Sequence, residues 1–249
     1  MDLGITGRRA AVAGASAGLG LGTARALAQA GAHVAICGRD RARVEAAAGS
    51  IGHGCVPLVC DVSDAAGGAR FVAQANEALG GVDILVPNAG GPPPGTFAST
   101  AVEAYETALD LSLLSVVGMC KAAVPAMQER GWGRVVAITS VSVRQPIATL
   151  ILSNTARAGV TGFLKTLALE VARDGVTVNS VQPGLHTTDR VTGLYGGAVP
   201  EVLAKNIPAG VLGDPEDFGR VTAFLCSEAA RFITGAHLPV DGGTYLGLQ

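Results

Sequence analysis

The sequence predicts an α/β protein with one domain, residues 1–249, in which helices flank a doubly wound parallel sheet. Its short apolar runs lack the polar alternation of half-exposed strands, as expected when a parallel sheet is buried on both faces. Longer stretches of helical period separate these runs, and each is long enough for the crossover between parallel strands. No linker-like change of composition and no repeat of fixed period divides the chain. The alternating order therefore predicts βαβ units.

The expected strands are the short apolar runs at residues 10–13, 34–37, 56–60, 84–86, 135–139 and 176–181. The expected helices are the longer stretches at residues 20–30, 41–48, 65–79, 102–128, 153–173 and 215–227. Proline and glycine follow two of the strands directly, at residues 90–95 and at Pro183-Gly184. Loops over a ligand crevice would lie at these places.

The composition favours a compact protein that acts on small molecules. Hydrophobic residues make up 49% of the chain and charged residues 15%, so burial can offset the entropy lost on folding. The net charge is -2 and no run of Lys or Arg occurs, which argues against nucleic-acid and membrane-surface binding. The five cysteines form no CxxC pair and the four histidines show no ligand spacing. Buried thiols are therefore predicted, with neither a disulfide framework nor a metal site.

The first residues are charged where a secretory signal would need an apolar core, at Asp2, Arg8 and Arg9. No apolar run reaches the roughly 18 residues of a membrane-spanning helix before a charge interrupts it. We therefore expect a cytoplasmic protein without a membrane span.

A glycine-rich turn follows the first expected strand and leads directly into a helix. It runs from Gly14 through Ser16, Gly18 and Leu19 to Gly20. Glycines allow the backbone to approach a pyrophosphate closely, and the amides and dipole at the helix start favour negative charge. Such turns also serve as simple connectors, so the pattern is weak by itself. Here, however, strand, turn and helix come in the order that a dinucleotide-binding motif requires.

The spacing of Gly14, Gly18 and Gly20 resembles the GxxxGxG motif of the short-chain dehydrogenase/reductase (SDR) family, whose domain is of the Rossmann type. Further family motifs follow in the family's order: Asp61-Val62 for adenine, Asn88-Ala89-Gly90 as the NAG motif, Pro183-Gly184 with Thr188 for the nicotinamide carboxamide, and Val240-Asp241-Gly242-Gly243 as the C-terminal signature. The resemblance spans nearly the whole chain. It implies that these residues bind a nicotinamide cofactor, in a layout similar to that of 3-oxoacyl-(acyl-carrier-protein) reductases.

The end of the second strand indicates which nicotinamide cofactor is used. An acidic side chain there binds the ribose diol of NAD, whereas a cationic one accepts the 2'-phosphate of NADP. Gly38 occupies the usual place of the acid and Arg39 follows it, so NADP is expected and NAD is the alternative. Two observations favour the alternative: Arg39 could be solvated while Asp40 caps the next helix, and Ala17 lacks the second basic side chain of many NADP users.

The four catalytic residues of the family match this chain at one position only. Ser140 stands at the serine position after the fifth strand, where its hydroxyl could hydrogen-bond a substrate oxygen. Thirteen residues later Ser153 replaces the tyrosine, and Arg157 replaces the lysine, so SxxxR stands in place of YxxxK. Ser112 replaces the asparagine. In the alternative interpretation, Ser153 only caps its helix and Arg157 is a surface or interface charge.

Acid catalysis is weakened by these replacements, because an aliphatic hydroxyl beside a guanidinium is a poor proton donor. Arg157 could still hold the ribose hydroxyls of the cofactor or polarise a substrate oxygen. Tyr195 and His186 follow the Pro183-Gly184 loop and could supply the missing acid, although a lone residue of either type is more often a packing element.

We expect a divergent NADP-linked oxidoreductase that acts on a small carbonyl compound or secondary alcohol, with residues 91–95 and 185–208 walling the substrate. One alternative is a lyase or isomerase similar to the haloalcohol dehalogenases, which also have arginine at the lysine position but keep the tyrosine and rebuild the glycine turn. The other alternative is an NADP-binding protein without catalysis. The resemblance implies a homotetramer or homodimer, because the corresponding two helices pack against their mates in family tetramers. The expected helices 102–128 and 153–173 agree with this, since they are apolar on more than one face.

Overall fold

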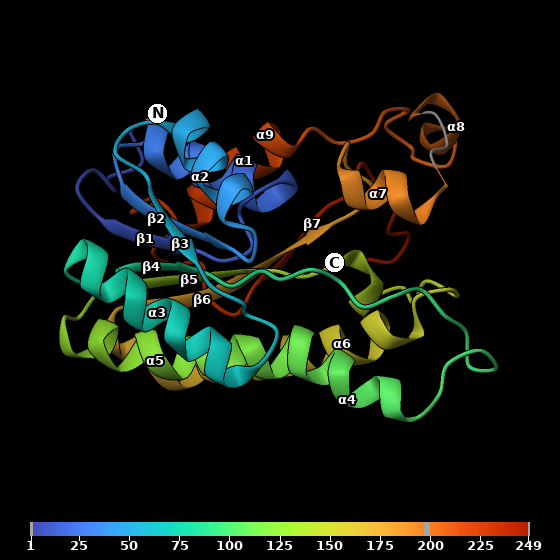
Figure 1. Cartoon of the computed structure of the whole chain (residues 1–249), viewed down its shortest axis with the longest axis horizontal. Coiled ribbons are helices and arrows are strands. Elements are labelled where there is room, and N and C mark those ends of the chain that lie inside the picture. The colour runs from blue at the N-terminus through green and yellow to red at the C-terminus, as the bar shows by residue number, and fades with distance from the viewer. Residues whose placement is uncertain (1, 197–199, 249) are drawn as a thin grey trace.

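The computed structural model describes residues 2–196 and 200–248, and its strands form one seven-stranded sheet (Figure 1). The strands are β1 (Arg9–Val12), β2 (His33–Gly38), β3 (Val56–Val59), β4 (Ile84–Val86), β5 (Gly133–Ile138), β6 (Val176–Pro183) and β7 (His237–Val240). Their order in the sheet is β3-β2-β1-β4-β5-β6-β7, and every neighbouring pair is parallel. The predicted doubly wound fold is confirmed, and its winding direction reverses between β1 and β4.

Helices cover both faces of the sheet. The longer ones are α1 (Gly18–Gln29), α2 (Arg41–Ile51), α3 (Ala65–Leu79), α5 (Ser115–Glu129), α6 (Ile151–Val171) and α9 (Pro215–Leu225). The shorter ones are α4 (Glu103–Leu109), α7 (Asp189–Leu194) and α8 (Pro200–Ala204). In Figure 1, α1, α2 and α9 lie above the sheet, whereas α3, α4, α5 and α6 lie below it.

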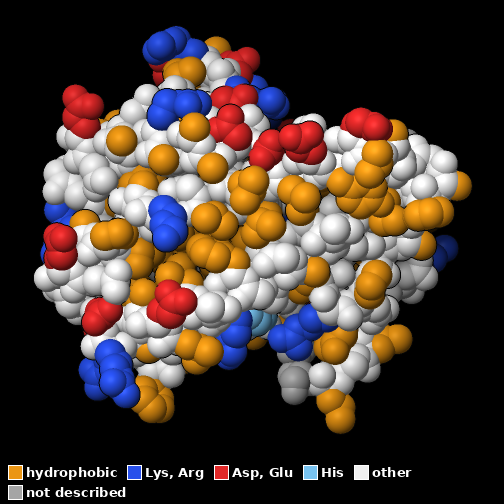
Figure 2. Space-filling view, turned by 90° about the horizontal axis from the view of Figure 1, so that it is seen from below, with side chains coloured by type: hydrophobic (Ala, Val, Ile, Leu, Met, Phe, Trp, Pro, Cys, Tyr) orange, Lys and Arg blue, Asp and Glu red, His pale blue; other side chains and the backbone are white. Residues whose placement is uncertain are grey.

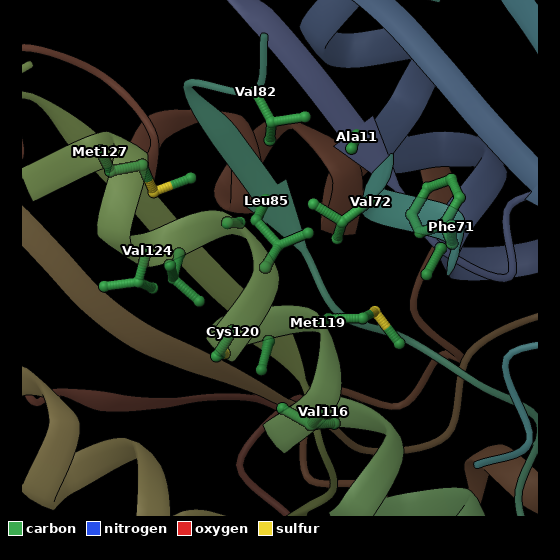
Figure 3. Packing of buried hydrophobic residues seen from close by; sticks show 14 of the residues in the cluster. Ala11, Phe71, Val72, Val82, Leu85, Val116, Met119, Cys120, Val124 and Met127 are labelled. Carbon is green, nitrogen blue, oxygen red and sulfur yellow. The ribbon is translucent and has the colours of Figure 1, made fainter. Parts of the chain in front are cut away.

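Alternate residues of one strand belong to opposite sides of the core. Ala10 and Val12 pack with the upper helices, whereas Ala11 packs with the lower ones. In β4, Leu85 points down into the cluster formed by α3 and α5, where Phe71 and Met119 are fully buried (Figure 3). This two-sided burial explains why the strands are continuously apolar in sequence.

Three elements differ from the sequence prediction. The run His237–Val240 was not predicted as a strand because it is short and contains Pro239; β7 tolerates this proline at the edge of the sheet. The predicted helix 102–128 is interrupted by a π-helical segment, Asp110–Leu114, between α4 and α5. The predicted wall segment 185–208 contains α7 and α8, and its residues 197–199 lie outside the described part.

The stretch Glu103–Glu129 is long and apolar enough to cross a membrane by length and composition alone. Half of its most apolar part is buried in the protein, and α5 packs against α3. This stretch is therefore a core helix of the fold. The five cysteines are free thiols; four of them are buried, as predicted, whereas Cys55 is half-buried.

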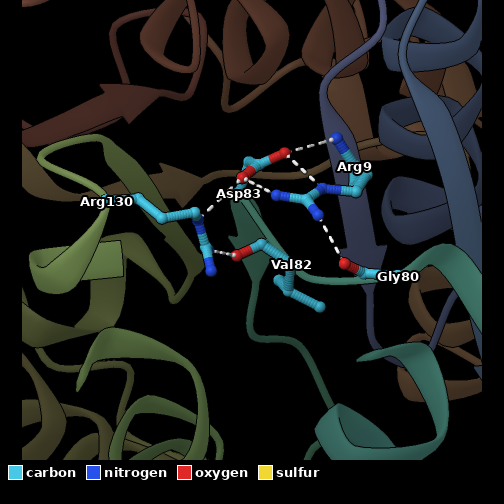
Figure 4. A network of polar contacts seen from close by, with 5 residues as sticks. All are labelled: Arg9, Gly80, Val82, Asp83 and Arg130. Atoms are coloured by element: carbon cyan, nitrogen blue, oxygen red, sulfur yellow. Dashed lines mark hydrogen bonds and ion pairs between the residues drawn. The ribbon is translucent and has the colours of Figure 1, made fainter. Parts of the chain in front are cut away.

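The amino ends of β1 and β4 are joined by an ionic network (Figure 4). Arg9 Nε donates to Asp83 Oδ2 at 2.7 Å, and Arg9 Nη2 donates to Oδ1 at 2.6 Å. Arg130 Nε lies 3.3 Å from Asp83 Oδ1. Burial would raise the pKa of Asp83, but the hydrogen bonds and charges of the two arginines outweigh it and lower the pKa. The network fixes the edge of the sheet opposite the pocket described next.

Candidate active site

A cavity of about 610 Å³ lies at the carboxyl ends of β1, β4, β5 and β6. It is lined by the turn after β1, the loop after β4, the residues after β5, the first turns of α6 and much of residues 183–207. The strand order reverses between β1 and β4, so the cavity occupies the crevice where doubly wound sheets bind ligands.

The glycine turn forms one wall and leaves a helix start open to the cavity. Gly14 and Gly18 both have φ of 56°, which favours glycine, and a Cβ on Gly20 would lie 2.6 Å from the carbonyl oxygen of Gly14. The N-cap of α1 is Ala17, which makes no side-chain cap, whereas Asp40 caps α2 and Asp64 caps α3. The first amides of α1 are thus available to an anion in the cavity.

Asn88 connects the end of β4 to this turn. Its Nδ2 donates to the carbonyl oxygen of Ala13 at 3.2 Å and to that of Gly14 at 3.1 Å. Its neighbours Ala89 and Gly90 also line the cavity. The predicted NAG motif therefore holds the glycine turn in place.

The loop after β6 forms the facing wall. Gly184 donates its backbone N–H to Val240, and a Cβ on Gly184 would lie 2.8 Å from Cα and Cβ of Asp241, so the C-terminal signature packs directly on the Pro183-Gly184 loop. Thr188 caps α7 and faces the glycine turn, since a Cβ on Gly18 would lie 3.3 Å from Thr188 Cγ2.

Three of the four predicted catalytic residues line the same cavity: Ser140, Ser153 and Arg157. Ser140 Oγ accepts a hydrogen bond from the backbone N–H of Ser142 at 3.1 Å. Ser153 is buried, and the N-cap of α6 is Leu150, so the interpretation of Ser153 as a helix cap is wrong. Within the described residues the Ser153 hydroxyl makes no hydrogen bond to the protein, which leaves it available to a ligand.

Arg157 is fixed by the end of β5. Its Nη1 donates to the carbonyl oxygens of Ile138 and Thr139, both at 3.1 Å. Burial lowers the pKa of Arg157 to about 10, and the positive charge of Arg190 contributes. The interpretation of Arg157 as a surface charge is therefore wrong, since the guanidinium is held inside the site.

Ser112 is separated from the other three residues. It lies in the π-helical segment and does not line the main cavity, but a second space of about 10 Å³ that Arg157 also lines. Its buried Oγ has no hydrogen-bond partner in the part of the chain that the structure describes. The space is close to the smallest that holds a water molecule.

Tyr195 and His186 both line the cavity but differ in burial. His186 is 3% exposed, its Nδ1 lies 3.2 Å from the carbonyl oxygen of Gly184, and its ring stacks edge-on against Phe218 at 5.1 Å. Burial lowers the pKa of His186 despite the hydrogen bond to Gly184. These contacts favour a packing role for His186, whereas Tyr195 is 42% exposed and free to contact a ligand.

Four residues predicted to bind the cofactor lie outside the lining of the cavity: Ser16, Arg39, Asp61 and Val62. Ser16 packs beside Gly38, whose Cβ would lie 3.2 Å from Ser16 Oγ. Arg39 is exposed, and Asp40 does cap α2 by accepting from the Arg43 N–H at 2.9 Å, as the alternative interpretation held.

Two arginines that line the cavity are not among the residues predicted from the sequence. Arg43 lies near the glycine turn and forms an ion pair of 3.8 Å with the exposed carboxylate of Asp189. Arg190 lies on α7 and donates to the carbonyl oxygens of Gly91 and Pro92, each at 3.1 Å. A signal for Arg43 was present, since it is the third arginine in the run Arg39-Asp-Arg-Ala-Arg43; nothing local pointed to Arg190.

The remaining wall is aliphatic. It consists of the side chains of Ile147, Leu150, Leu194, Leu203 and Ile207. The side-chain amide of Asn154 in α6 holds the loop that precedes this helix, by donating to the carbonyl oxygen of Ile147 at 2.9 Å. Among the described residues, no group of three or more His, Cys, Asp or Glu side chains is placed to hold a metal ion.

Residues 14–245 match the family model described as enoyl-(acyl carrier protein) reductase. Dehydrogenase/reductase SDR family member 4 of Oryctolagus cuniculus is 36% identical over 222 residues, covering 87% of this chain and 85% of the relative. The chain belongs to the short-chain dehydrogenase/reductase family. The predicted SDR resemblance is thus confirmed, and with it an oxidoreductase fold and family.

Solved SDR structures resemble this chain throughout. L-sorbose reductase from Gluconobacter frateurii, complexed with NADPH and L-sorbose, shares 32% identity and a TM-score of 0.92, with complete coverage of both chains. An NADPH-bound short-chain oxidoreductase from Pseudomonas aeruginosa PAO1, described as containing an atypical catalytic center, shares 33% identity and a TM-score of 0.90, covering 98% of this chain and 100% of the other.

Proposed function

We propose that this SDR is an NADP(H)-dependent oxidoreductase that interconverts a small carbonyl compound and its secondary alcohol. The observation that supports it most directly is one cavity that contains the open helix start of the glycine turn together with Ser140, Ser153 and Arg157. A phosphate-binding end and a set of groups for a substrate oxygen thus lie in one cavity.

The residues fit a dinucleotide. The uncapped amides of α1 and the closely packed glycine turn suit its pyrophosphate, because a side chain at Gly20 would fill the space. Gly184 and Thr188 would hold the nicotinamide carboxamide on the facing wall, as in the family. When bound, the nicotinamide supplies or takes up the hydride, and the protein contributes orientation and charge.

Charge at the adenosine end favours NADP(H) over NAD(H). Position 38 lacks the acid that would bind a ribose diol, and Ser16 occupies the space beside it. Arg39 and Arg43 lie on the segment that follows β2, where a 2'-phosphate would be met by guanidinium groups. Both SDR structures described above contain NADPH.

The replaced residues favour electrostatic over acid catalysis. During reduction the carbonyl oxygen gains negative charge, which the Ser140 hydroxyl and the Arg157 guanidinium would stabilise by hydrogen bonds. Ser153 would orient the same oxygen, and water would supply the proton that converts the alkoxide to the alcohol. A dedicated acid contributes roughly 10²- to 10⁴-fold to a rate, so slow turnover is expected.

Association of the chain is part of the proposal. The face formed by α3 to α6 shows a hydrophobic area in its central part, with charged side chains around it (Figure 2). Leu114 and Leu169, from the π-helical segment and α6, are 41% and 71% exposed. An apolar helical face of this kind favours a homodimer or homotetramer, which light scattering would test.

Calorimetric titration with NADPH and with NADH tests the proposal. Trp132 is unsuitable as an energy-transfer probe because it precedes β5, whose far end meets the cavity. We expect tighter binding of NADPH, followed by oxidation of NADPH in the presence of an acetoacetyl thioester or other small ketones. The absence of binding to either cofactor would refute the proposal, and binding without turnover over a broad panel of ketones would indicate a binding protein.

A further inference from the structure

Two guanidinium groups line the cavity without a carboxylate partner. Within the described residues, neither Arg157 nor Arg190 forms an ion pair, although both line the pocket. The acidic residue among the described lining is Asp189, whose side chain is 91% exposed and pairs with Arg43. These two guanidinium groups therefore give the pocket lining positive charge.

The two guanidinium groups are close enough for the charge of one to affect the pKa of the other. The charge of Arg190 lowers the pKa of Arg157, and burial lowers the pKa of both. Arg157 is half-buried and Arg190 is exposed, and both line the same pocket. Two such cations without a carboxylate partner among the described residues favour a ligand that brings negative charge.

Each guanidinium is held by backbone carbonyl oxygens. Arg157 is held by the end of β5, and Arg190 by Gly91 and Pro92 in the loop after β4. Gly91 makes this possible, since a Cβ there would overlap the Arg190 guanidinium. Carbonyl oxygens orient the groups without neutralising them, so their positive charge stays available to a ligand.

The position of Arg157 distinguishes the possible anions. Cofactor phosphates suit the start of α1 and Arg43, at the glycine turn. Arg157 instead lies at the end of β5 beside Ser140, where the reacting oxygen is expected. The aliphatic wall from Ile147 to Ile207 completes this part of the pocket.

We propose that Arg190 and Arg157 together bind a carboxylate of the substrate, so that this enzyme acts on aliphatic oxo acids or the corresponding hydroxy acids. The inference rests on the proposed function. Because Arg157 also serves the reacting oxygen, the carboxylate must be within one or two carbons of the carbonyl, as in 2-oxo and 3-oxo acids. The alkyl chain would lie against the aliphatic wall.

The test compares 2-, 3- and 4-oxohexanoate with their methyl esters by calorimetric titration of the NADP⁺ complex, with NADPH oxidation as a second readout. We expect the 2-oxo or 3-oxo acid to bind at least about tenfold more tightly than its ester, since a charge-assisted hydrogen bond is worth that much. The preference should be smaller for the 4-oxo acid.

Variants connect this preference to the two arginines. Arg190→Gln and Arg157→Met should lower the preference for the acid over the ester below about threefold, whereas Arg190→Lys should retain part of it. Gly91→Ala should act like Arg190→Gln, yet add nothing in the Arg190→Gln background, because its Cβ displaces the same guanidinium. The control is Arg220→Gln, which removes one charge from an exposed pair with Asp217 and should leave the preference unchanged.

Equal binding of acid and ester would overturn the inference while leaving the proposed function intact. A loss of NADPH affinity in the Arg157 and Arg190 variants, without a change in the preference for the acid, would overturn it too by assigning both groups to the cofactor. If neither NADPH nor NADH binds, the proposed function fails, and titration of the same acids and esters into the protein alone still decides whether the arginines bind a carboxylate.

Discussion

Arginines occur at both edges of the sheet, and their partners differ. At the amino edge, Asp83 forms ion pairs with Arg9 and Arg130, and Glu228 lies 3.7 Å from Arg134. At the carboxyl edge, Arg157 and Arg190 are held only by backbone carbonyl oxygens among the described residues. The first arrangement is complete by itself and stabilises the fold, whereas the second leaves positive charge for a ligand.

Trp132 reinforces this difference. The guanidinium groups of Arg8 and Arg134 lie over its ring, 3.8 and 4.3 Å from the ring centroid, and its Nε1 donates to Glu228. At the amino edge, cations thus pack against an aromatic ring and carboxylates. At the carboxyl edge, Tyr195 and Asp189 line the cavity, but among the described residues neither of them pairs with Arg157 or Arg190. The surroundings of Arg157 and Arg190 therefore differ from those of the arginines at the amino edge, whose role is structural.

The largest expected effect is that of Asp83→Asn at the amino edge. Removing the carboxylate leaves Arg9 and Arg130 without a counter-charge, so the free energy of unfolding should fall by about 3 kcal/mol in urea denaturation. Asp217→Asn, which breaks an exposed pair with Arg220, should change it by less than about 0.5 kcal/mol. Equal effects of the two variants would contradict the structural role of the network.

The second effect concerns the carboxyl edge, where a substitution should lower activity strongly and stability only slightly. Arg157→Met should lower kcat/KM for ketone reduction about 100-fold, since it removes a group that stabilises the developing oxyanion. The same change should cost little stability, less than about 1 kcal/mol, because it removes a desolvated charge that has no carboxylate partner. A variant that is strongly destabilised yet active when folded would show that Arg157 is structural.

A third, smaller effect concerns cofactor choice. Replacing both Arg39 and Arg43 with alanine should weaken NADPH binding about tenfold and leave NADH binding unchanged, because only NADPH has a 2'-phosphate. Arg41→Ala is the matched control, since Arg41 belongs to the same helix but pairs with Glu45 in solvent. An equal loss of affinity for NADPH and NADH in the double variant would show that the two arginines do not bind the 2'-phosphate.

The smallest effect is the pH dependence of the amino edge. The folded-state pKa of Asp83 is lowered, so its stabilisation is fully present above its unfolded value of about 3.9 and is lost as pH falls through the folded value. The stability difference between the unchanged protein and Asp83→Asn should be constant from pH 5 to 7 and shrink in acid. Urea unfolding at several pH values measures this, and a difference that grows in acid would be contradictory.

The fold and the glycine turn could be predicted because their signals are local. Continuous apolar runs such as Ile84–Val86 follow from burial on both faces, and the turn at Gly14 and Gly18 follows from a backbone with positive φ. The strand β7 was missed because four residues with a proline give no such pattern. The position of Ser112 was missed as well, since the π-helical segment changes which face of the helix carries it.

The sequence by itself determined the order of strands and helices, the phosphate-binding turn and the residues at the catalytic positions, because each depends on neighbours a few places along the chain. Only the tertiary structure decided the charge of the site. Arg157 meets carbonyl oxygens 18 and 19 residues away, and Arg190 meets one 99 residues away. Whether a guanidinium contacts a carboxylate, a carbonyl oxygen or solvent depends on how distant segments pack, and a local sequence pattern does not predict that packing.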